Sequence, residues 1–392
     1  MFKSTALSQG LASGTTFATT IYLSHELDIG QFGQIAQAIY LSALALTLFS
    51  SLISHPLLAL VNSSSELENH IENISKILLL FLISTSIAIW IICRYISLEN
   101  LTEECILLTI GMTLREYARK LLVATNQTQK LILLECITIC SLVLGIAATS
   151  YLTPYTALLV IGFSNLGPAL IALPTHLRAH RKQWHRGTTN TVEFYEFAKW
   201  NFGSAAIAVI LSSSFPLLMS IQYGSNFAAS FRATQNVFGL LGIIGLFYET
   251  WLQKQLASQQ DNLTKKIRST NALVLTVGVL GTILLWQVAF SAIYPKSITA
   301  LLLDNKSIVY LTYAIQSMTL IYVTEKVIAR SRGNTRQLFI ASLVGAVILV
   351  IGQTTSFLNF NSTIPLAIWL TSLTTSSLLL YLWNRTQKCI EP

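Results

Sequence analysis

The sequence predicts an all-α membrane protein with about twelve transmembrane helices, arranged in two six-helix lobes around a central cavity. Hydrophobic residues make up 53% of the 392 residues, and charged residues only 11%. A water-soluble domain could not bury so much apolar surface, so lipid must surround most of it. A spanning helix needs about 20 apolar residues, and the chain has room for roughly a dozen.

Apolar runs of spanning length fall into two sets of six. We expect an N-terminal lobe in residues 1–175, a basic cytoplasmic linker in residues 176–196 and a C-terminal lobe in residues 197–392. The helices predicted in the first lobe cover residues 5–25, 34–60, 75–97, 101–124, 130–151 and 154–174. Those predicted in the second lobe cover residues 197–221, 227–254, 271–293, 301–328, 336–357 and 363–384. Such a division is typical of two-lobed transporters.

The formal net charge of +8 comes from Lys and Arg clusters between the apolar runs. This placement indicates contact with membrane lipids and argues against nucleic acid as a partner. Of the 25 basic residues, 21 fall on the side of the predicted membrane that holds the N-terminus, and four on the other. Because basic residues resist translocation in short loops, we expect a multi-pass inner-membrane protein with both termini in the cytoplasm.

Sequence motifs for catalysis are missing. There is no phosphate-binding loop with its Lys, no HExxH motif and no CxxC pair, and the cysteines lack metal-ligand spacing. We therefore expect no enzyme, no catalytic residue, no metal and no cofactor, with energy supplied by an ion gradient, a membrane potential or substrate supply. The predicted outer loops, of which 295–303 and 97–104 are the longest, are too short for a glycosyltransferase or polymerase domain. An assembly partner without transport remains an alternative.

Basic residues inside predicted helices are the first candidates for a binding site, because a charge deep in the bilayer is costly unless it faces a cavity or a partner. Arg115 and Arg119 lie four residues apart on one helix face. They either line the cytoplasmic mouth of a cavity, where they would bind phosphate, or anchor the helix among headgroups. Arg232 has no acid nearby in the sequence, and Gln235 and Asn236 extend its polar surface.

Acidic residues in the predicted helices are candidates for coupling to H⁺ or Na⁺. Glu135, Glu249 and Glu325 lie near helix ends, where carboxylates either bind a coupling ion or pair with local basic residues. His25 belongs to a polar group at the outer end of the first predicted helix, which either gates a cavity or is solvated.

Three of these segments resemble motifs of one family. Residues 23–33 read Leu-Ser-His-Glu-Leu-Asp-Ile-Gly-Gln-Phe-Gly, which resembles the Leu-Ala-Arg-x-Leu-Gly-Pro-x-x-Phe-Gly signature of polysaccharide flippases. Residues 115–120 resemble a fourth-helix motif found in a subset of them, and residues 231–235 resemble their Tyr-Arg-Ala-x-Gln motif. These flippases belong to the multidrug/oligosaccharidyl-lipid/polysaccharide exporter superfamily. The chain departs from the pattern at His25 and Asp28, where the family usually has Arg and Gly.

The resemblance implies a flippase that moves an undecaprenyl-pyrophosphate-linked oligosaccharide across the bacterial inner membrane by alternating access. Its cargo would be a unit of O-antigen, capsule or exopolysaccharide, and polysaccharide polymerase machinery would be a partner. The resemblance assigns Arg115, Arg119 and Arg232 to the pyrophosphate, whereas a neutral imidazole at His25 would bind it more weakly. The alternative is a cation-coupled small-molecule or multidrug exporter of the same fold, which predicts an acidic cavity floor instead.

Overall fold

The computed structural model describes residues 2–54, 57–58, 64–96, 98–125, 127–180, 203, 206–207, 214–247, 261–331, 334–356 and 363–386. Within these residues every regular element is a helix, and eight helices are long and apolar enough to cross a membrane. The protein is therefore an all-α, multi-pass membrane protein, as the hydropathy pattern predicts.

The helices pack into two compact units, which we describe separately. The first unit contains residues 1–15 and 34–209, and the second contains residues 16–33 and 210–392. Helices α1 (Phe2–Glu26) and α2 (Ile29–Phe49) contribute residues to both units. The lobe boundaries at residues 175 and 197 stay a prediction, because the linker beyond residue 180 lies outside the described residues.

In the first unit, α1 and α2 are followed by π-helix η1 (Ser50–Ser54), α4 (Ser64–Cys93), 3-10 turn η2 (Glu99–Leu101), α5 (Thr102–Ala124), α6 (Thr128–Ala148) and α7 (Pro154–His180). Helix α5 packs against α4, α6 and α7. It approaches α7 closely because Gly111 faces Gly162, where an added Cβ would lie 2.5 Å from the carbonyl oxygen. This contact brings the charged end of α5 against α7.

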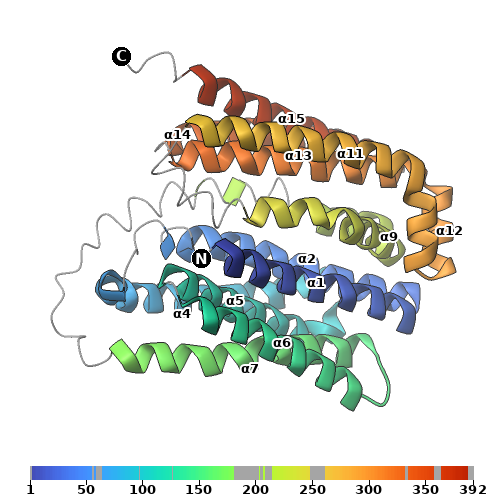
Figure 1. Cartoon of the computed structure of the whole chain (residues 1–392). Coiled ribbons are helices and arrows are strands. Elements are labelled where there is room, and N and C mark those ends of the chain that lie inside the picture. The colour runs from blue at the N-terminus through green and yellow to red at the C-terminus, as the bar shows by residue number, and fades with distance from the viewer. Residues whose placement is uncertain are drawn as a thin grey trace. The chain divides into compact units, whose positions relative to one another are not determined.

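The second unit adds α9 (Ser214–Phe247), α11 (Asp261–Ile293), α12 (Lys296–Asp304), α13 (Lys306–Ser331), α14 (Thr335–Ser356) and α15 (Thr363–Thr386). Helix α13 contacts α9, α11, α14 and α15, and Figure 1 shows α11, α13, α14 and α15 running side by side. Large apolar side chains on α11 face outward, as expected for a lipid-facing helix. They are Leu273, Val277, Leu280, Leu284 and Val288.

Residues 222–226, which the sequence predicts as a connection between two helices, lie within the single helix α9. Only Gly224 leaves helical geometry there, with φ 82° and ψ 178°, a conformation that favours glycine. Gly33 of α2 lies against the next residue, Ser225, and an added Cβ would overlap its carbonyl oxygen. A break at one residue therefore replaces the connection that hydropathy predicts.

The segment predicted as the outer loop 295–303 is instead mostly helical. Pro295, with φ −57°, precedes α12, and its carbonyl oxygen accepts a hydrogen bond from the Thr299 amide at 3.1 Å. Ile298, Thr299 and Leu302 are buried while the other side of α12 is exposed. Nine residues are too few to register as a spanning run, so the hydropathy pattern did not reveal this helix.

Candidate functional site

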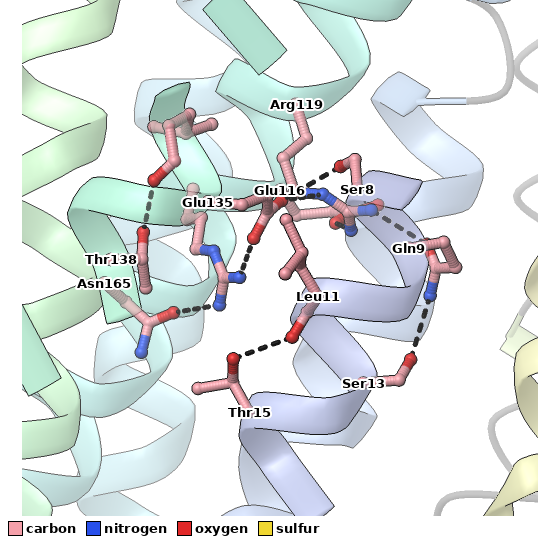
Figure 2. A network of polar contacts seen from close by, with 12 residues as sticks. Ser8, Gln9, Leu11, Ser13, Thr15, Glu116, Arg119, Glu135, Thr138 and Asn165 are labelled. Atoms are coloured by element: carbon pink, nitrogen blue, oxygen red, sulfur yellow. Dashed lines mark hydrogen bonds and ion pairs between the residues drawn. The ribbon is translucent and has the colours of Figure 1, made fainter. Parts of the chain in front are cut away.

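A fully buried carboxylate lies at the centre of a polar network in the first unit (Figure 2). Glu135 of α6 pairs with two arginines of α5: Arg115 Nη2 donates to its Oε2, and Arg119 Nε lies 2.8 Å from its Oε1. Ser8 Oγ of α1 also donates to Oε1, at 3.3 Å. Two predicted binding residues and one predicted coupling residue therefore form one ion-paired group.

The two arginines are also held from other helices. Arg115 Nη1 donates to Asn165 Oδ1 of α7 at 2.8 Å, and Asn165 Nδ2 donates in turn to the Ile161 carbonyl. Arg119 Nη2 donates to Gln9 Oε1 of α1 at 2.8 Å. We call this group the Glu135 cluster: Ser8, Gln9, Arg115, Glu116, Arg119, Lys120, Glu135 and Asn165.

The Glu135 cluster carries more positive than negative charge. Glu116 accepts a hydrogen bond from Arg119 Nη1 at 2.7 Å and lies 3.2 Å from Lys120 Nζ. The named residues thus include three basic side chains and two carboxylates. The Arg115 and Arg119 side chains are 15% and 16% exposed, whereas Glu135 is 0% exposed. A surplus cation in apolar surroundings attracts an anion, and the arginines are the side from which one can approach.

A second buried carboxylate is held in the second unit. Glu325 of α13 is bound by one edge of the Arg268 guanidinium group of α11, whose Nε and Nη2 donate to its two oxygens at 2.8 and 2.7 Å. Asn384 Nδ2 of α15 donates to Glu325 Oε2 at 2.9 Å, and Arg268 stacks on the ring of Tyr381. We call Arg268, Glu325, Tyr381 and Asn384 the Glu325 cluster. Its one cation balances its one anion.

Arg232 differs from Arg115 and Arg119 because no acidic partner for it lies in the described part of the chain. It is half-buried on α9, and its Nε atom is buried without a hydrogen-bond partner. One turn later, Asn236 Nδ2 donates to the Tyr294 hydroxyl at 3.0 Å and to the Phe17 carbonyl at 3.2 Å. Tyr294 donates to the Ala233 carbonyl, so it braces the α9 turn that carries Arg232. Gln235 is half-buried beside Asn236.

Two predicted residues remain, His25 and Glu249. His25 is exposed, and its Nε2 lies 2.8 Å from the Ile293 carbonyl, to which it donates. Glu249 lies outside the described residues. No group of three or more His, Cys, Asp or Glu side chains in the described part of the chain is placed to hold a metal ion.

Sequence reasoning missed several residues that hold the two predicted carboxylates and the predicted arginines in place. Among them are Ser8, Gln9, Asn165, Arg268, Tyr294 and Asn384. Asn165 had a usable signal, because an amide within an apolar run needs a partner. Arg268 had a weaker signal, because it precedes the helix predicted at 271–293 and resembles the other basic residues on the cytoplasmic side.

No protein-family model and no curated protein matches the chain. Solved structures do match. "Lipid II flippase MurJ, inward closed conformation" is 14% identical with a TM-score of 0.68, over 97% of this chain and 87% of that one. The MATE multidrug transporter DinF-BH is 12% identical with a TM-score of 0.67, over 98% of this chain and 93% of that one.

The eukaryotic MATE transporter AtDTX14 is 14% identical with a TM-score of 0.66, and the match covers 100% of this chain and 97% of that one. These matches span nearly the whole chain, although few residues are identical. The chain therefore has the fold that these MATE transporters and the lipid II flippase share.

Proposed function

We propose that the chain is a flippase that moves an undecaprenyl-pyrophosphate-linked oligosaccharide across the bacterial inner membrane by alternating access, with both termini in the cytoplasm. The observation that carries this proposal is the positive surplus of the Glu135 cluster. Arg115 and Arg119 present planar guanidinium groups, which bind phosphate oxygens through paired hydrogen bonds. A pyrophosphate headgroup supplies phosphate oxygens that both guanidinium groups can bind.

Arg232 supports the same class of substrate. A half-buried guanidinium group without a carboxylate partner among the described residues is costly unless an anion reaches it. Asn236 and Tyr294 fix the helix turn that carries it, so the charge is held in position before a ligand arrives. In this proposal Arg232 offers a phosphate contact within the second unit.

The solved structures with this fold include a protein titled a lipid II flippase and proteins titled multidrug transporters. The fold is therefore compatible with both a lipid-linked and a small-molecule substrate. The charge of the candidate site favours the lipid-linked one, because its headgroup is anionic.

The second candidate function is a cation-coupled exporter. The buried carboxylates of Glu135 and Glu325 favour it, since such groups can take up a proton or Na⁺. Both carboxylates, however, are already bonded to arginines in this structure. Loading an ion onto either one would require separating those pairs first, so we rank this function second.

Transfer of a labelled undecaprenyl-pyrophosphate oligosaccharide across proteoliposomes tests the proposal. We expect the wild type to transfer this substrate. Arg115→Ala and Arg232→Ala should each transfer it at least about tenfold more slowly than the wild type, because each variant loses a charged hydrogen bond to the substrate phosphate. Arg336→Ala is the matched control, since Arg336 is exposed on α14. A wild type that transfers none of several glycans, but exports a cationic drug along an H⁺ or Na⁺ gradient, would establish the second candidate instead.

A further inference from the structure

The two oxygens of Glu135 occupy the positions that an anionic ligand would need. One oxygen accepts from Arg115 and the other lies 2.8 Å from Arg119, so the carboxylate bridges two guanidinium groups of one helix. A phosphate group bridges two arginines through two of its oxygens in the same way. Glu135 and a phosphate group therefore compete for the same donors.

The exposure of the side chains indicates how an anionic ligand can reach the arginines. Glu135 is fully buried between α5, α6 and α1, whereas both arginine side chains keep an exposed portion. Arg115 Nε is buried without a hydrogen-bond partner, so the present contacts do not satisfy this guanidinium group completely. A ligand can thus contact the arginines without passing through the carboxylate.

The rest of the cluster offers Arg115 no acidic partner if Glu135 is displaced. Glu116 pairs with Arg119 and Lys120 of its own helix, and no bond joins it to Arg115. Arg115 would then keep only the neutral amide of Asn165. Glu135 is the one acidic partner that Arg115 has in the described part of the chain.

We infer that Glu135 is a resident counterion, which holds Arg115 and Arg119 between transport cycles and is displaced by the phosphate groups of the arriving headgroup. This inference rests on the proposed function and adds a role to its site. The carboxylate weakens binding of the headgroup, because the headgroup must separate an existing ion pair. The Glu135 carboxylate also speeds release of the headgroup, because it can pair with the arginines again as the headgroup leaves. A transporter needs such moderate affinity on both sides of its cycle.

The test compares Glu135→Gln with the wild type as purified full-length proteins in neutral detergent. Inorganic pyrophosphate and a short-chain polyprenyl pyrophosphate are titrated separately by calorimetry, which distinguishes a site for a free anion from a site for a lipid headgroup. We expect Glu135→Gln to bind at least one of the two about tenfold more tightly, because the amide keeps the shape but removes the competing charge. The double variant Glu135→Gln with Arg115→Gln should lose this gain.

The matched control is Glu103→Gln, the same chemical change at an exposed position of α5. It should bind both probes as the wild type does, which separates a local effect from a change in net charge. Glu135→Asp provides a second variant in case Glu135→Gln does not fold. Its shorter carboxylate cannot contact both arginines, so we expect a smaller gain in affinity for the probes. Unchanged or weaker binding of both probes by both Glu135 variants would overturn the inference.

Transport measurements separate this inference from the proposed function. If the wild type transfers the lipid-linked oligosaccharide and Glu135→Gln does so with lower KM and lower maximal rate, the displaced counterion is supported. If the wild type transfers it and Glu135→Gln matches the wild type in binding and rate, the inference fails and the flippase stands. If the wild type transfers no lipid-linked oligosaccharide, the flippase fails, and with it the role in release that we assign to Glu135.

Discussion

The Glu135 cluster and the Glu325 cluster are built from the same parts but balance their charges differently. Each places a buried glutamate against arginine from one neighbouring helix, with an asparagine from another. Glu135 divides its two oxygens between two arginines, whereas both oxygens of Glu325 accept from one edge of a single arginine. The first group keeps a positive surplus and the second is neutral. In our proposal, similar ion-pair chemistry serves binding in the first unit and helix packing in the second.

The largest expected effect separates the two clusters by stability. Arg268→Ala leaves Glu325 buried with no cation, which costs about 3–5 kcal/mol, whereas Arg115→Ala leaves Glu135 paired with Arg119 and should cost about 1–3 kcal/mol. Denaturant unfolding of the purified variants measures both. An equal or larger loss for Arg115→Ala would show that the Glu135 cluster is the more important for the fold.

A smaller loss of stability should follow from a substitution that pushes α5 and α7 apart. Gly111→Ala places a Cβ against the Gly162 carbonyl, which should cost about 1–3 kcal/mol and draw Arg115 away from Asn165. Gly239→Ala on α9 is the matched control, since its added Cβ meets nothing within 4 Å. That variant should be neutral or gain up to about 1 kcal/mol. If both variants unfold alike, the close α5–α7 contact does not position the cluster.

Replacing either asparagine should reduce the free energy of unfolding by a similar amount, but only one replacement should weaken pyrophosphate binding. Asn165→Ala and Asn384→Ala each remove a hydrogen bond to a charged group, worth about 1.5–3 kcal/mol at most. Asn165→Ala should also weaken pyrophosphate binding about threefold, because Arg115 loses a bond that orients it. Calorimetry alongside unfolding tests this. A comparable binding loss in Asn384→Ala would remove the distinction between the clusters.

The smallest effects set the baseline for these comparisons. Glu103→Gln and Arg336→Ala change exposed charges outside both clusters, so their stability should stay within about 0.5 kcal/mol of the wild type. Thermal unfolding at low and high salt is sufficient to check them. A larger shift in either would mean that net charge alone contributes to the differences above.

The sequence predicted the charged residues better than their partners. Arg115, Arg119 and Glu135 could be singled out because a charge within an apolar run is conspicuous. Their mutual pairing could not, since Arg115 and Glu135 meet only when α5 packs on α6. Ser8 joins them from 127 positions away. Side-chain pairs that depend on helix packing leave no trace in local hydropathy.

Helix boundaries were predicted where they coincide with the ends of apolar runs, as for α5 and α15. The prediction was wrong where backbone geometry decides. Gly224 breaks α9 through its positive φ, which hydropathy does not register, and α12 is a short amphipathic helix that reads as a loop between spans.

Helix α11 makes the second unit sensitive to the thickness of its bilayer. Its span, Thr264–Ile293, has 30 residues, which extend about 45 Å, against about 30 Å for a typical hydrocarbon core. Such a helix must tilt or project from the membrane. Because Arg268 lies in its second turn, a change in the tilt of α11 relative to α13 would strain the bond to Glu325. We therefore expect lipid chain length to affect the Glu325 cluster.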